Sequence, residues 1–318
     1  MLALNDRLSG GLVGLLVGDA LGVPYEFHRA DALPRADQIE MAPPAGFSRS
    51  HDGVPPGTYS DDGAQALCLL ASLLDREYLD PEDLGSRLLS WLEHGYLAVD
   101  GLVFDVGVQT NTALKAFAAG RPALEAGPRQ ESANGNGSLM RVLPLALWHR
   151  GSDAELVRDA DLQSRVTHGH VRSRVCCMLY CLWARRTLAG DPSAWGSAAA
   201  ALRSLLGPGE EAEALEFHIR PDDTSTEGRG SGYVVDALRS ARMCAAEPTF
   251  EAAVRRAIAL GDDTDTTACL TGGIVGVRDG VNSIPLRWRE ALRGTDLWEP
   301  LLSRLLERQA TVRIPRRR

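Results

Sequence analysis

Apolar residues recur every three or four positions along most of the chain, which is the spacing that places them on one face of an α-helix. After residue 60, for example, Leu67, Leu70 and Leu74 fall on a single stripe. Signals for β-strands are poor, because few runs of Val, Ile and Thr alternate with polar residues. The pattern therefore predicts an all-α protein.

The predicted helices follow one another along the chain. They cover residues 5–17, 60–74, 81–94, 105–118, 139–149, 154–166, 171–188, 192–206, 210–219, 232–245, 250–260, 267–277, 286–293 and 297–307. The break at residues 34–56 is rich in Pro, Gly and polar side chains and predicts a long loop. No repeat and no linker divides the chain, so we expect one domain over residues 1–310, followed by a disordered basic tail at 311–318.

Composition narrows the class of protein. The 318 residues are 44% hydrophobic and 24% charged with a formal net charge of −8, which is ordinary for a globular protein and argues against general nucleic-acid binding. The N-terminus lacks the order of a signal peptide, and the apolar runs are too short or too glycine-rich to span a bilayer. Six cysteines without paired spacing indicate a reduced, cytoplasmic protein. We expect a monomer without membrane contact.

The densest chemistry lies at residues 261–267, where three carboxylates and three hydroxyls occur together. Asp262, Asp263 and Asp265 would repel one another if unpaired, and a bound cation is the simplest remedy. A helix N-cap is the plainer alternative, but one cap needs only one such residue. The stretch also satisfies the D-x-D-x-T pattern of a phosphatase, yet it follows helix-patterned residues instead of a buried strand. An EF-hand is excluded because its central Gly and distal Glu are misplaced.

A second acidic cluster stands about two hundred residues earlier. Ser60, Asp61 and Asp62 again combine a hydroxyl with two carboxylates at a predicted helix start. If the fold brings the two clusters together, they complete one shell of oxygen ligands. Hard oxygen ligands without His or Cys favour Mg²⁺ or Mn²⁺ over Zn²⁺. Two helix caps that match by coincidence remain the alternative.

Other motifs accompany these two in a fixed order. The whole series is Gly18-Asp19-Ala20-Leu21-Gly22 with Glu26, Ser60-Asp61-Asp62, Phe104-Asp105-Val106-Gly107, Gly135-Asn136-Gly137-Ser138-Leu139-Met140-Arg141 with Pro144, Thr167-His168, Ser231-Gly232-Tyr233-Val234-Val235, and residues 261–266. In these motifs the chain resembles the ADP-ribosylglycohydrolases; one motif alone is weak, but seven in family order are specific. The resemblance implies a compact, orthogonal all-α bundle and a hydrolase that cleaves the glycosidic bond between ADP-ribose and a modified acceptor.

The resemblance also implies which residues carry the reaction. Matched position by position, the ligands of two Mg²⁺ or Mn²⁺ ions would be Ser60, Asp61, Asp62, Asp263, Asp265 and Thr266. The residues that would hold ADP-ribose are Gly135, Asn136, Gly137, Ser138, His168 and Tyr233. A glycine-rich backbone at a helix start suits a diphosphate, because its N–H groups and the helix dipole attract anions. The acceptor stays open between an Arg or Ser side chain of a protein, a nucleobase, a small metabolite and poly(ADP-ribose).

Three carboxylates are candidates for the acid and base roles of glycosidic cleavage: Asp62, Asp105 and Glu26. Arginine-type relatives have a substrate-side carboxylate at the position of Asp105, and serine-type relatives have a glutamate that approaches the metals at the position of Glu26. Asp62 would polarise the attacking water. Helix capping at Asp105 and a surface carboxylate at Glu26 are the plainer alternatives, and structural roles are the alternatives for His168 and Tyr233.

Two positions depart from the family's motifs. Gly63 stands where relatives commonly have Thr, which removes a hydroxyl beside the first cluster, and Asp262 stands where many relatives have Gly. We expect Arg141 to brace the acidic centre or a helix end, and we do not expect His168 and His170 to bind metal. The main rival is a non-enzymatic relative kept for ADP-ribose binding or structure, against which the intact carboxylates argue.

Overall fold

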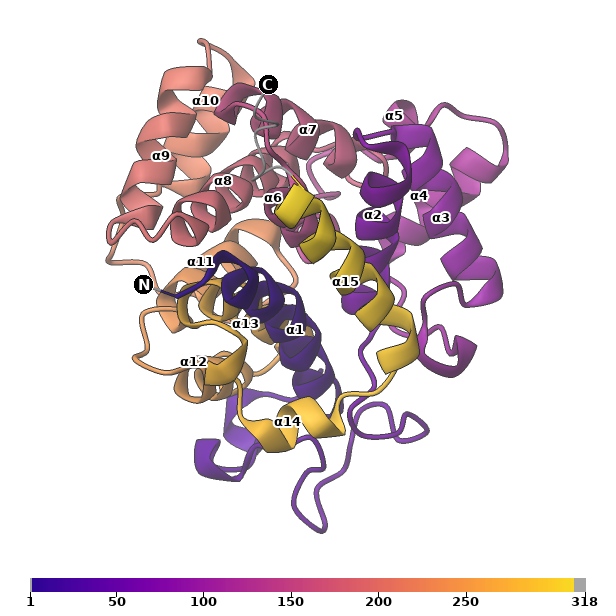
Figure 1. The fold of residues 1–318 in the computed structure, drawn as a ribbon, viewed down its shortest axis with the longest axis vertical. Coiled ribbons are helices and arrows are strands. Elements are labelled where there is room, and N and C mark those ends of the chain that lie inside the picture. The colour runs from indigo at the N-terminus through magenta and orange to yellow at the C-terminus, as the bar shows by residue number, and fades with distance from the viewer. Residues whose placement is uncertain (1, 312–318) are drawn as a thin grey trace.

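The computed structural model describes residues 2–311, and within this range the regular structure is helical apart from two isolated bridges (Figure 1). The α-helices are α1 (Leu4–Gly22), α2 (Asp61–Arg76), α3 (Pro81–His94), α4 (Val108–Ala118), α5 (Ala123–Ala126), α6 (Leu143–Trp148), α7 (Asp153–Arg165), α8 (Val171–Leu188), α9 (Ala194–Leu205), α10 (Glu210–Glu213), α11 (Val234–Cys244), α12 (Phe250–Ile258), α13 (Thr264–Asp279), α14 (Leu286–Ala291) and α15 (Thr295–Thr311). Short 3₁₀ or π turns are η1 (Val23–Tyr25), η2 (Ala30–Ala32), η3 (Ala36–Gln38), η4 (Val99–Gly101), η5 (Ala214–Ile219) and η6 (Val281–Ser283). The predicted all-α fold is confirmed.

A pair of helices from opposite ends of the chain, α1 and α13, forms the centre of the molecule (Figure 1). Glycines recur every fourth residue on the face of α1 that meets α13, at Gly10, Gly14, Gly18 and Gly22. A Cβ atom at Gly14 would lie 2.4 Å from the carbonyl oxygen of Gly272, and one at Gly18 only 2.1 Å from that of Ala268. The two backbones are therefore in direct contact, and side chains are excluded from this seam.

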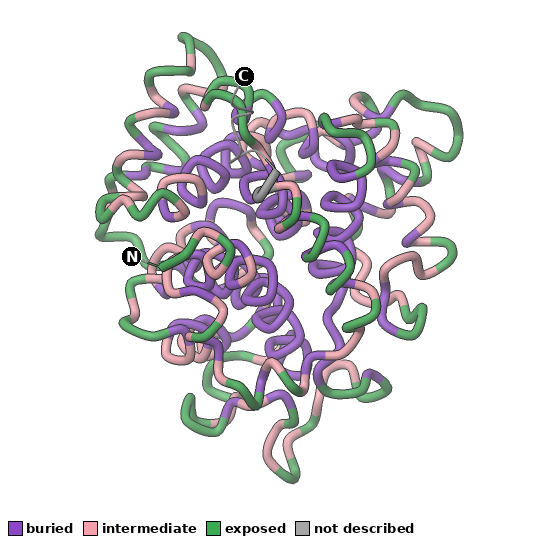
Figure 2. Tube along the Cα trace, in the orientation of Figure 1, coloured by how far each residue is buried: buried purple, intermediate pink, exposed green. Residues whose placement is uncertain are grey.

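The other helices pack around this pair and bury it (Figure 2). On one side α2 packs against α3 and α6, while α7, α8 and α9 form a second group, and α11 and α12 cover α13. The last helix, α15, lies across α1 and α2 (Figure 1). One continuous apolar core results, and both acidic motifs start helices, α2 and α13, that run into it.

The segment Leu4–Tyr25 is long and apolar enough, with a mean hydropathy of 1.3, to span a membrane by length and composition alone. Our expectation that no apolar run would meet that criterion is wrong for this segment. However, 94% of its most apolar 18 residues are buried inside the protein against α13 and its neighbours. Its hydropathy is therefore explained by its place in the core.

Several helix boundaries differ from the predicted ones. The helix predicted from Asp105 begins at Val108, because Asp105 adopts a left-handed backbone with φ 54° and Gly107 takes the cap position. Helix α6 is shorter than residues 139–149, since a turn occupies its predicted start. Helix α13 begins at Thr264, three residues early, so Asp265 lies in its first turn. The single domain over residues 1–310 stays a prediction, and the predicted tail lies, from residue 312 on, outside the described residues.

Candidate metal centre and substrate cleft

The first acidic motif forms the start of α2. Ser60 is the N-cap, and its Oγ accepts a hydrogen bond of 3.3 Å from the backbone N–H of Asp62. Asp19, near the end of α1, accepts from the backbone N–H groups of Ser60 at 2.9 Å and Gly63 at 2.7 Å. This fully buried carboxylate fixes the orientation of α2 and was not among the predicted site residues. In the sequence, the role of Asp19 was indicated by its being a single acidic residue within the strongly apolar second half of α1.

The second acidic motif forms the start of α13 and meets the first. Thr266 donates a hydrogen bond of 3.3 Å from its Oγ1 to Asp62 Oδ1, which joins the start of α13 to the start of α2. Asp265 Oδ1 accepts from the backbone N–H of Thr266 at 2.8 Å. Asp263 accepts from Asn136 Nδ2 at 2.7 Å. The two clusters are thus adjacent, as predicted from the sequence, whereas ligation by their six residues remains a prediction.

The donor set fits a hard cation. Asp62 Oδ2 and Asp265 Oδ2 are buried without a hydrogen-bond partner, although nearly all such atoms in proteins have one. Burial and then the neighbouring carboxylates raise the pKa values of Asp61, Asp62 and Asp265 well above the usual range. Carboxylate oxygens of Glu26, Asp263 and Asp265 also come within 4.8 Å of one another. A divalent cation among these oxygens would satisfy the orphaned atoms and offset the repulsion.

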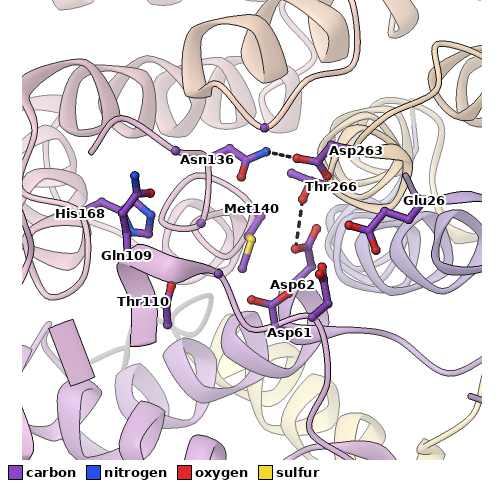
Figure 3. A pocket seen from close by; sticks show the side chains of 15 residues that line it. Glu26, Asp61, Asp62, Gln109, Thr110, Asn136, Met140, His168, Asp263 and Thr266 are labelled. Carbon is purple, nitrogen blue, oxygen red and sulfur yellow. Dashed lines mark hydrogen bonds between the residues drawn. The ribbon is translucent and has the colours of Figure 1, made fainter. Parts of the chain in front are cut away.

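A cavity of about 220 Å³ opens above the two helix starts. It is lined by Glu26, Asp61, Asp62, Asp105, Gly107, Gln109, Thr110, Gly135, Asn136, Gly137, Met140, His168, Gly232, Asp263 and Thr266. Figure 3 shows the carboxylates gathered on one side, with Gln109 and His168 opposite and the amide of Asn136 reaching across to Asp263. None of these described lining residues is Lys or Arg. The cavity therefore has an acidic half and a neutral, hydrogen-bonding half.

The predicted glycine-rich loop forms part of the neutral half. The backbone N–H of Asn136 donates to the carbonyl of Gly232 at 3.1 Å, while its side chain reaches Asp263, so the loop is tied to the start of α13. Gly135 and Gly137 face the cavity, but Ser138 does not line it: its Oγ is buried 2.8 Å from Ser164 Oγ. Gln109, Thr110 and Met140 line the cavity but were not predicted, since α4 and the loop carry no distinctive polar pattern there.

The remaining predicted substrate residues differ in placement. His168 lines the cavity, and its Nδ1 lies 2.8 Å from Thr167 Oγ1. Burial, and secondarily the positive charge of Arg141, lower the pKa of His168 to about 3, so the ring is neutral and suited to hydrogen bonding. Tyr233 lies beside the cavity, where its hydroxyl accepts from Arg172 at 3.4 Å. His170 instead caps α8.

Glu26 and Asp105 meet at the acidic side together with a residue that was not predicted, His51. His51 Nε2 lies 2.7 Å from Glu26 Oε2, and the three side chains can place their donor atoms within 4.8 Å of one another. Burial and the charges of Asp105, Asp263 and Asp61 raise the pKa of Glu26 to about 11, while burial and Asp263 raise that of Asp105 to about 6. His51 belongs to the long loop at residues 34–56, which has no periodicity to mark it. Glu26 is therefore not a surface carboxylate, since it is 3% exposed, and Asp105 is not a helix cap, since Gly107 takes the cap position of α4.

Arg141 braces the acidic centre, as predicted, through a relay. It is fully buried and donates to Gln65 Oε1 at 3.0 Å, and Gln65 Nε2 donates to Asp61 Oδ2 at 2.8 Å. It also donates to the side chain and the backbone of Gln163. Burial lowers the pKa of Arg141 to about 10. The amide of Gln65 therefore transmits the orientation of the guanidinium to a predicted metal ligand.

The two departures from the family's motifs have local explanations. A Cβ at Gly63 would lie 2.9 Å from Leu16 Cδ2 and from the Cβ of Tyr59, so these side chains already fill the space of a larger residue. Asp262 is exposed and has φ 56°, a conformation that glycine adopts without strain. Neither departure removes an atom from the cavity. The phosphatase reading is wrong, because residues 263–267 start a helix instead of following a strand.

Comparison with known proteins gives the same result as the motifs. The family model described as ADP-ribosylglycohydrolase matches residues 1–314. The ADP-ribosylarginine hydrolase Tri1 of Pseudomonas putida (strain GB-1) is 30% identical over 96% of this chain and 80% of its own, and the ADP-ribosyl-(dinitrogen reductase) glycohydrolase of Rhodospirillum rubrum is 28% identical over 91% of each. A solved structure described as an ADP-ribosylglycohydrolase-related protein complex has a TM-score of 0.75 and 32% identity, covering 96% and 98% of the two chains. The chain belongs to the ADP-ribosylglycohydrolase family.

Proposed function

We propose that this ADP-ribosylglycohydrolase depends on Mg²⁺ or Mn²⁺ and releases ADP-ribose from an acceptor modified on an arginine side chain. The observation that carries the metal dependence is the pair of buried carboxylate oxygens, Asp62 Oδ2 and Asp265 Oδ2, that lack any protein partner. A buried charge without compensation costs several kcal/mol, so such an arrangement persists where a cation supplies the missing interaction. Ser60, Asp61, Asp62, Asp263, Asp265 and Thr266 are the proposed ligands.

The charge of the cavity supports the same requirement. ADP-ribose carries a diphosphate, whereas the cavity is lined by five carboxylates and, among its described lining residues, by no Lys or Arg. An anion would be repelled from such a surface unless cations were bound. Bound divalent cations would supply the Lewis acidity that activates water and orients the ribose hydroxyls.

The protein's own side chains divide the remaining tasks. Asn136 and the backbone of the glycine loop hold the diphosphate side of the substrate, while neutral His168 and Gln109 offer hydrogen bonds opposite the carboxylates. Glu26 carries a proton and donates it in a hydrogen bond to Asp105, so the pair contains one acid and one base. In the proposed reaction Glu26 protonates the leaving nitrogen and Asp105 receives the proton of the attacking water.

Arginine is the acceptor that best matches the acidic half of the cavity. A guanidinium group is planar and cationic, so the carboxylate of Asp105 attracts it, while this carboxylate offers a serine hydroxyl only a hydrogen bond. Relatives named as ADP-ribosylarginine hydrolases, from Pseudomonas putida and Serratia proteamaculans, are 30% and 31% identical to the chain. The same class of substrate is therefore proposed here.

The test is a panel of peptides ADP-ribosylated on arginine or serine, offered with Mg²⁺, with Mn²⁺ or with EDTA. We expect release of ADP-ribose from the arginine peptide with either metal and none in EDTA. Asp263→Ala should abolish turnover and weaken metal binding measured by calorimetry, with an unchanged helical spectrum. Asp37→Ala, which removes an exposed carboxylate paired only with Arg35, is the matched control and should behave as wild type. Full activity in EDTA, or in Asp263→Ala, would refute the metal assignment.

A further inference from the structure

An exposed aromatic residue beside the acidic half of the cavity is held in a strained conformation. Phe27 follows Glu26, is 67% exposed, and has φ 60°, which is rare for a bulky side chain. Two backbone hydrogen bonds of 2.7 Å hold it there, from Phe27 N–H to the carbonyl of Asp262 and from Asp262 N–H to the carbonyl of His28. Strain that neighbouring structure enforces on an exposed ring indicates a function for that ring.

Phe27 is one member of an aromatic group that we call the aromatic wall: Phe27, His51 and Phe104. The His51 ring lies between the other two, with ring centroids 5.8 Å from Phe27 and 5.1 Å from Phe104. Each Phe adjoins a cavity carboxylate in sequence, Glu26 before Phe27 and Asp105 after Phe104. His51 reaches Glu26 through its Nε2. The wall therefore adjoins the two carboxylates, through the chain at Phe27 and Phe104 and through the contact of His51 with Glu26.

We propose that the aromatic wall determines acceptor specificity by stacking on the planar, cationic guanidinium of the modified arginine. This inference rests on the proposed function. A guanidinium gains from an aromatic face and from a carboxylate at the same time, and the wall and the pair Glu26 and Asp105 present both at adjoining positions. A neutral serine linkage gains little from either. The wall thus selects for the acceptor, while the glycine loop binds the ADP-ribose that all acceptors share.

The packing of the wall explains why it can act as a rigid surface. The backbone hydrogen bond between Phe27 and Asp262 attaches Phe27 to the residue before Asp263. The position of Phe27 is therefore fixed relative to the start of α13. The bridge between Arg29 and Gly261 extends this pairing by one further step. An acceptor stacked on Phe27 is therefore positioned relative to the same helix that carries the proposed metal ligands.

The test distinguishes an effect of the aromatic ring face of Phe27 from an effect of its apolar volume. Phe27→Leu keeps an apolar side chain but removes the aromatic face, and Phe27→Tyr keeps the face. For the arginine-linked peptide we expect Phe27→Leu to lower kcat/KM on the order of tenfold, mostly through KM, and Phe27→Tyr to retain it. The Kd for ADP-ribose, which has no acceptor group, should stay within about twofold in both variants. Agmatine, a free guanidinium compound, should inhibit wild type better than it inhibits Phe27→Leu.

Tyr78→Leu is the matched control, because Tyr78 is an exposed aromatic residue beyond the far end of α2 from Asp61. It should leave every readout unchanged. An arginine-peptide kcat/KM in Phe27→Leu within twofold of wild type, or an equal loss of ADP-ribose affinity, overturns the inference. A wild type that cleaves only the serine peptide also overturns it, although the hydrolase function then stands. A wild type that cleaves neither peptide with any metal refutes the proposed function itself.

Discussion

Removing the metal should make the stability of this protein fall as the pH rises, and the structure sets the size of the effect. Asp19 and Asp105 are buried among other carboxylates, which raises their pKa values from 3.8 to about 7 and about 6. A raised folded-state pKa means that the folded protein binds more protons than the unfolded chain between the two values. The stabilisation is therefore complete below pH 3.8 and is lost as the pH rises through the folded pKa.

The magnitude follows from the shifts. Each pKa unit corresponds to about 1.4 kcal/mol, so Asp19 contributes about 4 kcal/mol of lost stability by pH 7 and Asp105 about 3 kcal/mol or less. A bound cation favours the charged carboxylates and cancels this loss. The free energy of unfolding with Mg²⁺ or Mn²⁺ minus that in EDTA should therefore grow by at least roughly 4–7 kcal/mol between acid and neutral pH, because Glu26, Asp61, Asp62 and Asp265, whose pKa values burial also raises, shift it in the same direction. Groups that the cation does not influence cancel in this difference.

The assay is denaturant unfolding, followed by circular dichroism, at a series of pH values with metal and with EDTA. Asp19→Asn is the matched variant, because it keeps an acceptor for the N–H groups of Ser60 and Gly63 but cannot ionise. In Asp19→Asn, the free energy of unfolding with metal minus that in EDTA should grow less steeply with pH than in wild type. A difference that is flat or shrinks toward neutral pH would refute the account of the carboxylates as a cation site.

Two further predictions concern the backbone. Gly14→Ala should destabilise the protein by about 3 kcal/mol, because the new Cβ would meet the carbonyl oxygen of Gly272. Gly196→Ala in α9, where the new Cβ would have open space around it, should stabilise the protein by up to about 1 kcal/mol. Equal effects of the two substitutions on thermal unfolding would contradict the close contact between α1 and α13. Asp262→Gly should leave turnover unchanged and raise stability by about 1 kcal/mol or less, because glycine adopts φ 56° without strain; a loss of activity would instead assign the Asp262 side chain a part in the site.

The sequence predicted the parts of the site that local patterns encode. Ser60 caps α2 through its side chain, and Asp263 takes the N-cap position of α13 without a side-chain cap, so both acidic motifs stand at helix starts. Their adjacency followed from electrostatics, since isolated carboxylate clusters need a shared cation. The direct link from Thr266 to Asp62 is consistent with that reasoning.

The residues that sequence reasoning missed depend on contacts between distant segments. Asp19 shows its role only through N–H groups about forty residues away, and His51 only through Glu26, since its loop has no periodicity. Ser138 matched a motif, yet its hydroxyl faces Ser164, because the turn before α6 directs it inward. Motif matching identifies positions, whereas side-chain direction is decided by tertiary packing.

The glycine seam has a consequence for how the protein is made. Helix α1 leaves the ribosome well before α13, because the surface that it fits, Gly272 and its neighbours, is synthesised about 250 residues later. At ordinary translation rates that delay lasts tens of seconds, during which an apolar helix of membrane-spanning length lacks its main partner, α13. We therefore expect nascent chains that end before α13 to be held by chaperones that bind the α1 segment. Because the second acidic motif starts α13, the acidic centre as a whole cannot be assembled before α13 has been synthesised.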